Sequence, residues 1–441
     1  MATLEEAASY LAGLINVEKS PDFRRARLSL EPIRRLVERL GAPHAGLSVV
    51  HIAGSKGKGS TALLAEALLR AHGLRVGTFT SPHLESWTER FRIDGEEVAG
   101  EKLAEVVERL RPEVDALRDE RPEDAPSFFD ATTAAAFVLF AEARVDHAVL
   151  EVGLGGRLDS TNIVTPVVAC VTSIELEHTE KLGTSLEAIA GEKAGIAKPG
   201  IPLVMGALPP EAAVVVEERA GRLGCALARY GRELEAEILD QELDAQRIRL
   251  RDGSLSFEAR LAVAGAHQAH NAALALACVR RLGAIPDHAL GAAARHAFAA
   301  ASLPARIEFL SHRPWIVVDG AHTAASAEAL AQTLARIPCR RGHLVLSVSA
   351  GKDLVAICRS LLPFADRLTI TRAEPIRSLD PEEVRAAVRG FSAELEPRVV
   401  SDPRLAVREA RAALGAEDLL VAAGSVYLAG IARRVLIDET R

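Results

Sequence analysis

A glycine-rich segment between an apolar run and a helical pattern carries the clearest chemistry in the sequence. It reads Gly54-Ser55-Lys56-Gly57-Lys58-Gly59-Ser60-Thr61 and follows the apolar residues 49–53. Glycines let backbone N–H groups converge on phosphate oxygens, the start of a helix adds partial positive charge, and Lys58 adds a full one. The segment therefore predicts a loop that binds the phosphates of a nucleoside triphosphate.

This segment departs from the strict phosphate-loop pattern G-x-x-x-x-G-K-[ST]. Ile52 stands where the first glycine is required, and Gly59 follows Lys58 where a hydroxyl residue is required. A glycine-rich turn with two incidental lysines is the alternative interpretation. By itself the segment indicates nucleotide binding and no particular reaction.

A carboxylate follows a second apolar run, residues 148–150. If that run is a strand, Glu151 stands at the edge of the sheet that faces the glycine-rich loop. Mg²⁺ prefers oxygen ligands and, beside a nucleotide, takes one or two protein groups together with waters and phosphates. Glu151 is therefore a candidate magnesium ligand.

Five segments, in order along the chain, resemble the folate branch of the Mur ligase superfamily, the folylpolyglutamate synthase and dihydrofolate synthase family. The first is the glycine-rich loop, because a glycine after the lysine is typical of this branch. The others are residues 80–84, 128–132, 151–162 and 190–196. The resemblance extends from about residue 10 to residue 436.

The resemblance implies an ATP-dependent ligase that forms an amide through an acyl phosphate. L-Glutamate would supply the amine, and dihydropteroate or the γ-carboxylate of a reduced folate's glutamate tail would supply the acid. Two alternatives stay open: a Mur ligase for a non-folate acid, and a nucleotide-dependent switch that makes no amide.

A metal site with two Mg²⁺ ions is also implied by the resemblance. Ser81, Glu151 and His178 would be its protein ligands, and Lys193, in the helical pattern 186–198, would be carbamylated by CO₂. Carbamylation turns a cation that repels metal into an oxygen ligand. Together with Lys58, His178 and Lys193 are the expected catalytic residues. From the residue types alone, the alternatives are a histidine that is ion-paired on the surface, which those types favour, and an ordinary solvated lysine near Glu192.

Further residues are assigned to the substrates by resemblance. Asn271 would contact adenine, with Arg306 and Asp319 as further ATP contacts, although a helix cap is the alternative for Asn271. His322 and Ser425 would contact the incoming glutamate. The pterin-side substrate is assigned to Ser127, Phe128, Phe129, Asp130, Leu158, Asp159 and Ser160. For the two phenylalanines, packing in the core is an equal alternative.

Four departures from the family pattern bear on substrate choice more than on phosphoryl transfer. Lys56 replaces a common asparagine, Glu177 an aspartate, Lys181 an aromatic residue, and Thr323-Ala324 the pair Asn-Pro. None of them removes Lys58 or a proposed metal ligand.

Positioning these residues requires an α/β architecture, because short β-branched runs alternate with longer helical patterns. We expect two doubly wound, Rossmann-like domains: a P-loop ATPase domain over residues 1–302 and a smaller ligase domain over residues 303–441. A small antiparallel annex is expected within residues 234–263, with a turn at Asp252-Gly253. The expected strands are residues 47–53, 75–81, 146–153, 167–174, 202–206, 315–319, 343–349, 367–371 and 419–423.

Composition limits the partners. A chain of 441 residues exceeds one ordinary core, and its net charge of −7 argues against a nucleic-acid surface. The longest apolar runs are too short for a membrane span, and the N-terminus lacks a signal-like pattern. Five scattered cysteines lack metal or redox spacing. We expect a cytoplasmic protein with small-molecule partners, without nucleic acid or membrane, for which a monomer suffices.

Overall fold

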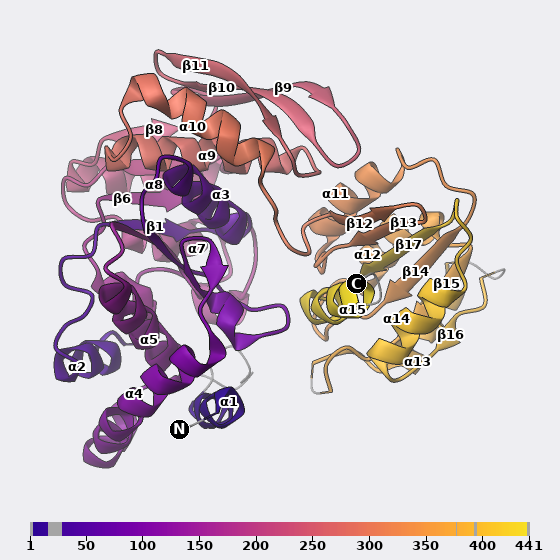
Figure 1. Ribbon diagram of the computed structural model, residues 1–441, viewed down its shortest axis with the longest axis horizontal. Helices are drawn as coiled ribbons and strands as arrows, with labels where there is room; N and C mark the ends of the chain where they lie inside the picture. Colours follow the sequence, from indigo (N-terminus) through magenta and orange to yellow (C-terminus); the bar gives the residue numbers. More distant parts are fainter. Residues whose placement is uncertain (1–2, 16–28, 376, 392–394, 439–441) are drawn as a thin grey trace. The chain divides into compact units, whose positions relative to one another are not determined.

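A computed structural model of the chain describes residues 3–15, 29–375, 377–391 and 395–438 (Figure 1). The described residues form two compact units. The first reaches Glu237 and includes Ile248–Ala259 and Ala269–Ala300, while the second comprises Ile238–Arg247, Arg260–Gln268 and the chain from Ala301 onward. The predicted division into domains over residues 1–302 and 303–441 remains a prediction.

An eight-stranded sheet forms the centre of the first unit, in the order β4-β3-β2-β5-β1-β6-β7-β8. The strands from β2 to β8 along this order are parallel, and β3 and β4 are antiparallel to their neighbours. The bounds are β1 (Val49–Ala53), β2 (Val76–Phe79), β3 (Phe91–Ile93), β4 (Glu96–Glu97), β5 (His147–Glu151), β6 (Val168–Val171), β7 (Leu203–Met205) and β8 (Leu227–Arg229). Strands β3, β4 and β8 were not predicted, because each has only two or three residues, too few to show an alternating pattern.

Helices cover both faces of this sheet. Every side chain of β1 is buried, and successive side chains of a strand point to opposite faces, so both faces must be covered. Figure 1 shows α3 and α5 on opposite sides of the strands. The helices are α1 (Leu4–Ala12), α2 (Glu31–Arg39), α3 (Lys58–Ala71), α4 (Gly100–Glu120), α5 (Phe128–Ala143), α6 (Thr179–Leu182), α7 (Leu186–Lys193), α8 (Pro210–Leu223), α9 (His267–Leu282) and α10 (Asp287–Ala299).

One predicted helix is too long. The pattern over residues 186–198 predicted a single helix, but α7 ends at Lys193 and a 3₁₀ turn follows over Ala194–Ile196. A Cβ on Gly195 would lie 2.4 Å from Cβ of Arg157, so the chain passes directly against the 157 loop at this point. That contact requires a glycine at position 195, two residues after Lys193.

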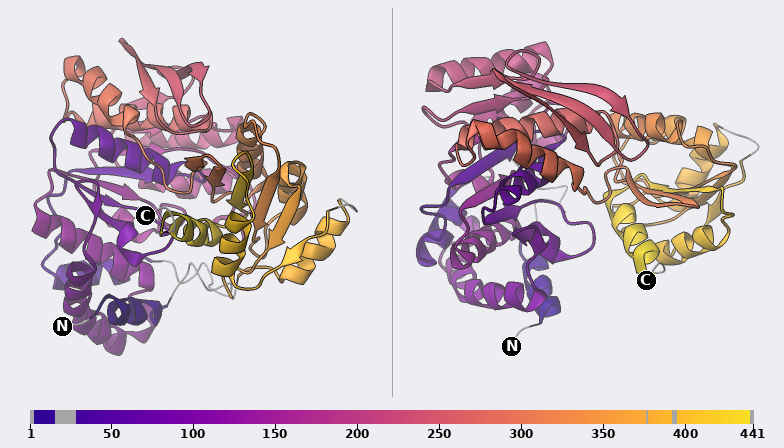
Figure 2. Two further views of the ribbon diagram at one scale, coloured as in Figure 1. Left: turned by 45° about the vertical axis from the view of Figure 1, so that its right-hand side comes forward. Right: turned by 45° about the horizontal axis from the view of Figure 1, so that its top comes forward.

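A three-stranded sheet, in the order β11-β10-β9, follows the first series of strands. It consists of β9 (Leu234–Gln241), β10 (Gln246–Asp252) and β11 (Leu255–Leu261). Connections this short join only antiparallel strands. Gly253, between β10 and β11, has φ 58°, as the predicted turn requires. The predicted annex is confirmed, and Figure 2 shows it from two further sides.

The second unit contains a six-stranded sheet in the order β12-β13-β17-β14-β15-β16, with only β12 antiparallel to its neighbour. Its strands are β12 (Glu308–His312), β13 (Trp315–Val318), β14 (Gly342–Leu346), β15 (Arg367–Ile370), β16 (Arg398–Val399) and β17 (Leu419–Ala423). Its helices are α11 (Ala324–Leu334), α12 (Leu354–Leu361), α13 (Pro381–Arg389), α14 (Pro403–Ala412) and α15 (Val426–Asp438). The predicted α/β class is confirmed in both units.

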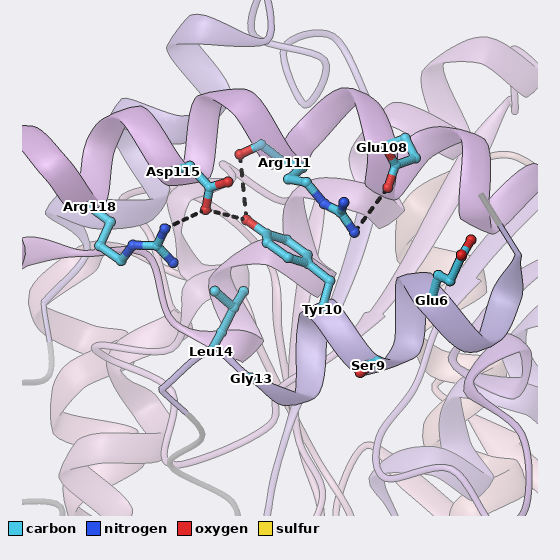
Figure 3. Close-up of a pocket in the computed structure, with 9 residues that line it drawn as sticks. All are labelled: Glu6, Ser9, Tyr10, Gly13, Leu14, Glu108, Arg111, Asp115 and Arg118. Atoms are coloured by element: carbon cyan, nitrogen blue, oxygen red, sulfur yellow. Dashed lines mark hydrogen bonds and ion pairs between the residues drawn. The ribbon is translucent and has the colours of Figure 1, made fainter. Parts of the chain in front are cut away.

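A cavity of about 800 Å³ lies between α1 and α4 (Figure 3). Four charged side chains that line it form ion pairs with one another: Arg118 lies 2.8 Å from Asp115, and Arg111 lies 3.0 Å from Glu108. The hydroxyl of Tyr10 donates to Asp115 as well. None of the residues predicted to do chemistry lines this cavity.

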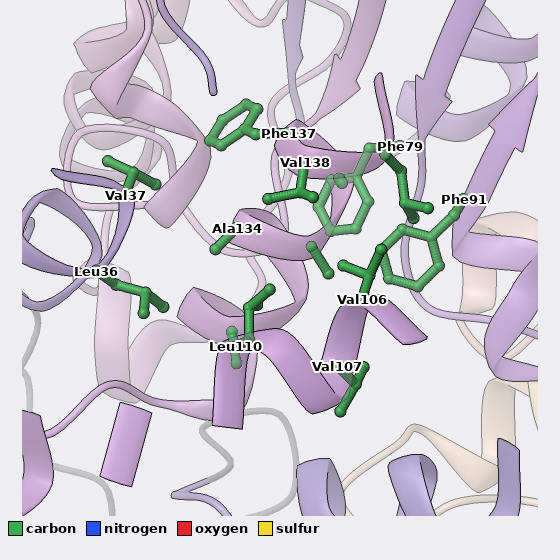
Figure 4. Packing of buried hydrophobic residues seen from close by; sticks show 14 of the residues in the cluster. Leu36, Val37, Phe79, Phe91, Val106, Val107, Leu110, Ala134, Phe137 and Val138 are labelled. Atoms are coloured by element: carbon green, nitrogen blue, oxygen red, sulfur yellow. The ribbon is translucent and has the colours of Figure 1, made fainter. Parts of the chain in front are cut away.

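A buried apolar cluster joins the first sheet to α2, α4 and α5 (Figure 4). Phe79 of β2 and Phe91 of β3 contact each other with ring centroids 5.6 Å apart, and Phe137 of α5 is fully buried. Alanines 134–136 of α5 are fully buried too, so this helix packs closely on its neighbours.

Replacing Phe137 by alanine should lower the free energy of unfolding by about 3–5 kcal/mol, because it opens a cavity in this cluster. Denaturant unfolding of the full chain measures the loss. The same change at Phe391, which is 41% exposed, should cost less than about 0.5 kcal/mol. Equal costs at both positions would contradict the packing described here.

Candidate active site

The predicted chemical residues of the first unit gather at one edge of its sheet. Strand β1 lies between β5 and β6, with Ile52 opposite both Glu151 and Cys170. The glycine-rich loop follows β1, Ser81 follows β2, Glu151 ends β5, and residues 172–178 follow β6. Parallel strands end at the same edge, which is where ligands of open α/β sheets bind.

Two glycines are required by the shape of the loop. Gly54 has φ 151° and Gly57 has φ 81°. A Cβ on Gly54 would lie 1.9 Å from Oγ1 of Thr172, and one on Gly57 would lie 2.5 Å from Oδ1 of Asn271. A side chain at either position would therefore displace the loop.

The segment after β6 holds the first half of the loop. Backbone N–H of Ser55 donates to the carbonyl of Ser173 at 2.8 Å, and that of Lys56 donates to the Ser173 hydroxyl at 2.8 Å. Lys58 opens α3, and the first N–H groups of a helix have no acceptor within it. The N–H groups available to an anion are therefore those at the start of α3.

Two lysines converge on one backbone oxygen. The amines of Lys58 and Lys193 each donate to the carbonyl of Gly54 at 3.0 Å. Lys58 lies 4.0 Å from Oε1 of Glu151, whose Oε2 accepts the N–H of Ser81 at 3.0 Å. The structure thus brings together four residues that were predicted from distant parts of the sequence.

Lys193, whose side chain is buried, also forms an ion pair with the half-buried Glu177, at 2.9 Å. Burial and the charge of Lys58 lower the pKa of Lys193 to about 8, against the opposing effect of Glu177. Burial acts to raise the pKa of Glu177, but the charges of Lys193 and Lys58 outweigh it and hold this pKa at about 2. Both partners are therefore charged at neutral pH.

His178 is more exposed than Glu151, another predicted metal ligand. Its side chain is 50% exposed, and Nδ1 lies 3.9 Å from Oε1 of Glu180. Among the described residues no group of three or more histidines, cysteines and acids is placed to hold a metal. One carboxylate beside the loop still suits Mg²⁺, which takes phosphates and waters as its remaining ligands. The ligand roles of Ser81, Glu151 and His178 stay predictions.

The pterin-side residues are tied together by hydrogen bonds within the chain. Ser127 caps α5 and donates to Oδ2 of Asp130 through its N–H at 2.8 Å and its hydroxyl at 2.6 Å. Ser160 donates to the other oxygen of Asp130 at 2.6 Å. Burial raises the pKa of Asp130, against these hydrogen bonds. The carboxylate thus joins the start of α5 to the loop after β5.

Asp159 organises that loop. Its Oδ2 accepts the N–H groups of Gly153 at 3.0 Å and Leu154 at 2.9 Å, and its Oδ1 accepts the N–H and hydroxyl of Thr161. Burial raises the pKa of Asp159 to about 6, while the hydrogen bonds oppose the rise. Sequence reasoning missed this role, although Asp159 two residues before Thr161 is an N-cap signal.

The two phenylalanines differ. Phe128 is 1% exposed and packs edge-on against Trp87, with the guanidinium of Arg90 over its ring at 5.2 Å. Core packing, the alternative for this position, is thus confirmed for Phe128. Phe129 is half-buried, as is Leu158. Substrate contacts of these three residues stay predictions.

Asn271 faces the loop from α9. The helix begins at His267, so the alternative of a helix cap at Asn271 is wrong. The side chain is 4% exposed and stands over Gly57. Contact with adenine stays a prediction.

In the second unit, Asp319 follows β13 and stabilises a strained turn. Its oxygens accept the N–H groups of Ile307 at 2.6 Å and Ala321 at 2.7 Å, and burial raises its pKa to about 6. Arg306 stands between two residues with positive φ, of which Ile307, at φ 48°, is β-branched. Glu308 also holds this turn, because it accepts the N–H of Ala305 at 2.8 Å. No pattern in the sequence had singled out Glu308.

The two residues predicted for glutamate lie after β13 and β17 of the second unit. Nδ1 of His322 donates to the carbonyl of Gly320 at 2.8 Å. Ser425 is 1% exposed and accepts the N–H of Tyr427 at 3.2 Å. Their roles, like those of Arg306 and Asp319 toward ATP, stay predictions.

Comparison with known domain families gives two matches. Residues 52–279 match the Mur ligase middle domain, and residues 305–426 match the Mur ligase glutamate ligase domain. In the described part of the chain, no helix has both the length and the apolar character that a bilayer crossing needs.

Relatives and solved structures agree with these matches. The dihydrofolate synthase/folylpolyglutamate synthase of Mycobacterium tuberculosis is 37% identical over 86% of this chain and 82% of its own length. M. tuberculosis folylpolyglutamate synthase complexed with ADP superposes with a TM-score of 0.88 at 32% identity, covering 98% of each chain. E. coli FolC in complex with DHPP and ADP superposes with a TM-score of 0.82 at 30% identity, covering 100% of this chain and 99% of its own.

Gly57→Ala should weaken nucleotide binding on the order of tenfold to a hundredfold, because the new Cβ displaces either the loop or Asn271. Titration calorimetry with ADP measures the change. Gly73→Ala is the matched control, since Gly73 has φ 82° with no atom within 4 Å of the added Cβ. Equal losses in both variants would mean that backbone strain alone explains the effect.

Proposed function

The chain belongs to the folylpolyglutamate synthase and dihydrofolate synthase family of Mur ligases and is an ATP-dependent ligase, and on that premise we propose its substrates and the roles of its residues. It joins L-glutamate to dihydropteroate, to the glutamate tail of a reduced folate, or to both. The observation that carries the proposal is the convergence of Lys58 and Lys193 on the Gly54 carbonyl, with Glu151 beside them.

ATP binds with its phosphates at the start of α3. The N–H groups of that first turn and the ammonium of Lys58 supply the positive charge, and Gly57 leaves room for the phosphates to approach the backbone. The complexes of two similar structures with ADP support this ligand. Mg²⁺, when bound, neutralises the phosphate charge, and Glu151 and Ser81 are the residues beside the loop that would hold it.

The reaction has two steps. A carboxylate oxygen of the folate acid attacks the γ-phosphorus of ATP, ADP leaves, and an acyl phosphate forms. The amine of glutamate then attacks the acyl carbon, loses a proton, and expels inorganic phosphate as the amide forms. Positioning and charge neutralisation provide most of the acceleration in such transfers. Lys58 stabilises the charge that develops on the transferred group.

Lys193 acts in its carbamylated form. Its neutral amine attacks CO₂ and releases one proton, which leaves a carbamate whose oxygens are suited to a second Mg²⁺. The short contacts of Lys193 with Gly54 and Glu177 place the amine next to the phosphate loop, where such a ligand is useful.

The substrates can be identified directly. Purified protein is incubated with ATP, Mg²⁺ and glutamate, together with either dihydropteroate or a reduced monoglutamyl folate, and the products are weighed by mass spectrometry. We expect glutamate adducts and one ADP for each amide formed. Phosphate release that needs neither glutamate nor an acid would instead identify a nucleotide-dependent switch.

Lys58→Ala should lower kcat on the order of 10²- to 10³-fold, since it removes a preorganised positive charge from the transferred phosphoryl group. The amide-forming assay measures the loss. Lys102→Ala removes an exposed lysine that pairs with Glu105 and Glu142, and should leave kcat unchanged. A Lys58→Ala enzyme with wild-type turnover would reject the phosphate-loop assignment.

Protein incubated with ¹³C-bicarbonate should show a carbamate resonance that Lys193→Arg abolishes together with amide formation. Lys198→Arg, a matched change five residues along the chain, should keep both the resonance and the activity. Full activity of the wild type in CO₂-depleted buffer, without a carbamate signal, would rule out the modification.

A further inference from the structure

A buried histidine on β1, His51, takes no part in the proposed reaction. His51 is fully buried, three residues before Gly54, and its side chain points to the loop after β5. Its Nε2 lies 2.8 Å from Oγ1 of Thr161. Thr161 is itself fully buried and belongs to the 3₁₀ turn Ser160–Ile163.

The direction of each hydrogen bond follows from counting protons. The Thr161 hydroxyl donates its single hydrogen to Oδ1 of Asp159, so toward His51 it can only accept. Nε2 of His51 therefore carries the hydrogen. Burial, with a smaller effect of Lys198, lowers the pKa of His51 to about 3, so the ring is neutral and Nδ1 carries no proton. Nδ1 is buried and has no hydrogen-bond partner among the described residues.

Asp159 links Thr161 to the turn that follows Glu151. Its Oδ2 accepts the N–H groups of Gly153 and Leu154, the second and third residues after Glu151. The network thus joins β1, whose end begins the phosphate loop, to the loop that carries Glu151 and the predicted folate-binding residues Asp159 and Ser160.

We propose that His51 is a positioning residue for the folate acid: its N–H fixes the Thr161 hydroxyl, which directs its own hydrogen to Asp159 and so holds the loop of residues 153–160 in its binding shape. Without that N–H, the hydroxyl can turn away from Asp159 and the loop loses a fixed contact. The ATP-binding groups of Lys58 and the α3 N-terminus do not depend on this route. The inference rests on the proposed ligase function.

Steady-state kinetics on the full enzyme tests the hydrogen-bonded chain from His51 through Thr161 to Asp159, which we call the relay. Thr161→Val keeps the shape but removes the hydroxyl, and should raise KM for the folate acid roughly tenfold while the Kd for ATP stays within about twofold. Thr161→Ser keeps the hydroxyl and should have a KM for the folate acid close to that of the wild type. His51→Gln retains an N–H donor and should lie closer to wild type than His51→Leu.

His147→Leu is the matched control. His147 is also a strand histidine bonded to a hydroxyl, with Nδ1 2.9 Å from Oγ of Ser48, but it begins β5, at the opposite end of the strand from Glu151. This variant should leave the KM for the acid unchanged.

A double-mutant cycle separates the relay from packing. Because His51→Leu and Thr161→Val break the same route, the double variant should raise KM no further than the stronger single variant. In addition, ¹⁵N NMR of His51 should show the neutral Nε2–H tautomer at pH 7 to 8, where Asp159 is ionised and accepts the Thr161 hydrogen.

Several outcomes would overturn the inference. They are additive effects in the cycle, an Nδ1–H tautomer, a wild-type KM in Thr161→Val, and equal losses for ATP and the acid. A wild-type protein that forms no amide would instead reject the proposed function.

Discussion

The charge balance around the Gly54 carbonyl is the constraint on which the site depends. Before Lys193 is carbamylated, its ammonium and that of Lys58 approach one backbone oxygen, and like charges this close repel each other unless counter-charges lie nearby. Glu177 and Glu151 supply them, each near one lysine. A bound triphosphate brings further negative charge to the same place, so the site is prepared for an anionic ligand before it arrives.

Backbone contacts make this balance possible. Gly54 and Gly57 let the loop pass within van der Waals distance of Thr172 and Asn271, and Gly195 lets the chain after Lys193 pass against Arg157. Because these approaches leave no room for a Cβ, the positions of the charged groups follow from the glycines as much as from the charged residues themselves.

The parts of the fold and site that could be predicted from the sequence are the local ones. Strand β1, the loop and the start of α3 lie within 15 or so residues, and their pattern determines their order. The apolar run before Glu151 likewise predicted its place at the sheet edge. The ion pair of Lys193 with Glu177 could not be predicted, because it depends on the course of the chain between β6 and α7. The bonds of Asp159 to Gly153 and Leu154 depend in the same way on how one loop folds back on itself.

A residue that lies in a ligand-binding motif need not be exposed to the ligand. Phe128, Asp130 and Asp159 lie in segments that resemble folate-binding motifs, yet each is buried and bonded or packed within the chain. A residue can shape a binding wall without forming its surface, and a sequence pattern does not distinguish these two roles.

Lys56 and Glu177, two of the departures from the family pattern, belong to one electrostatic group. The charge of Lys56 is among those that lower the pKa of Glu177, and it also lowers the pKa of Lys193. Glutamate is one methylene longer than the aspartate it replaces, and its carboxylate reaches the Lys193 amine at 2.9 Å. Lys56 adds one positive charge to the loop, whereas glutamate in place of aspartate leaves the charge unchanged and extends only the reach of the carboxylate. Both positions therefore act on Lys193: the cation of Lys56 lowers the pKa of its amine, and the carboxylate of Glu177 raises it.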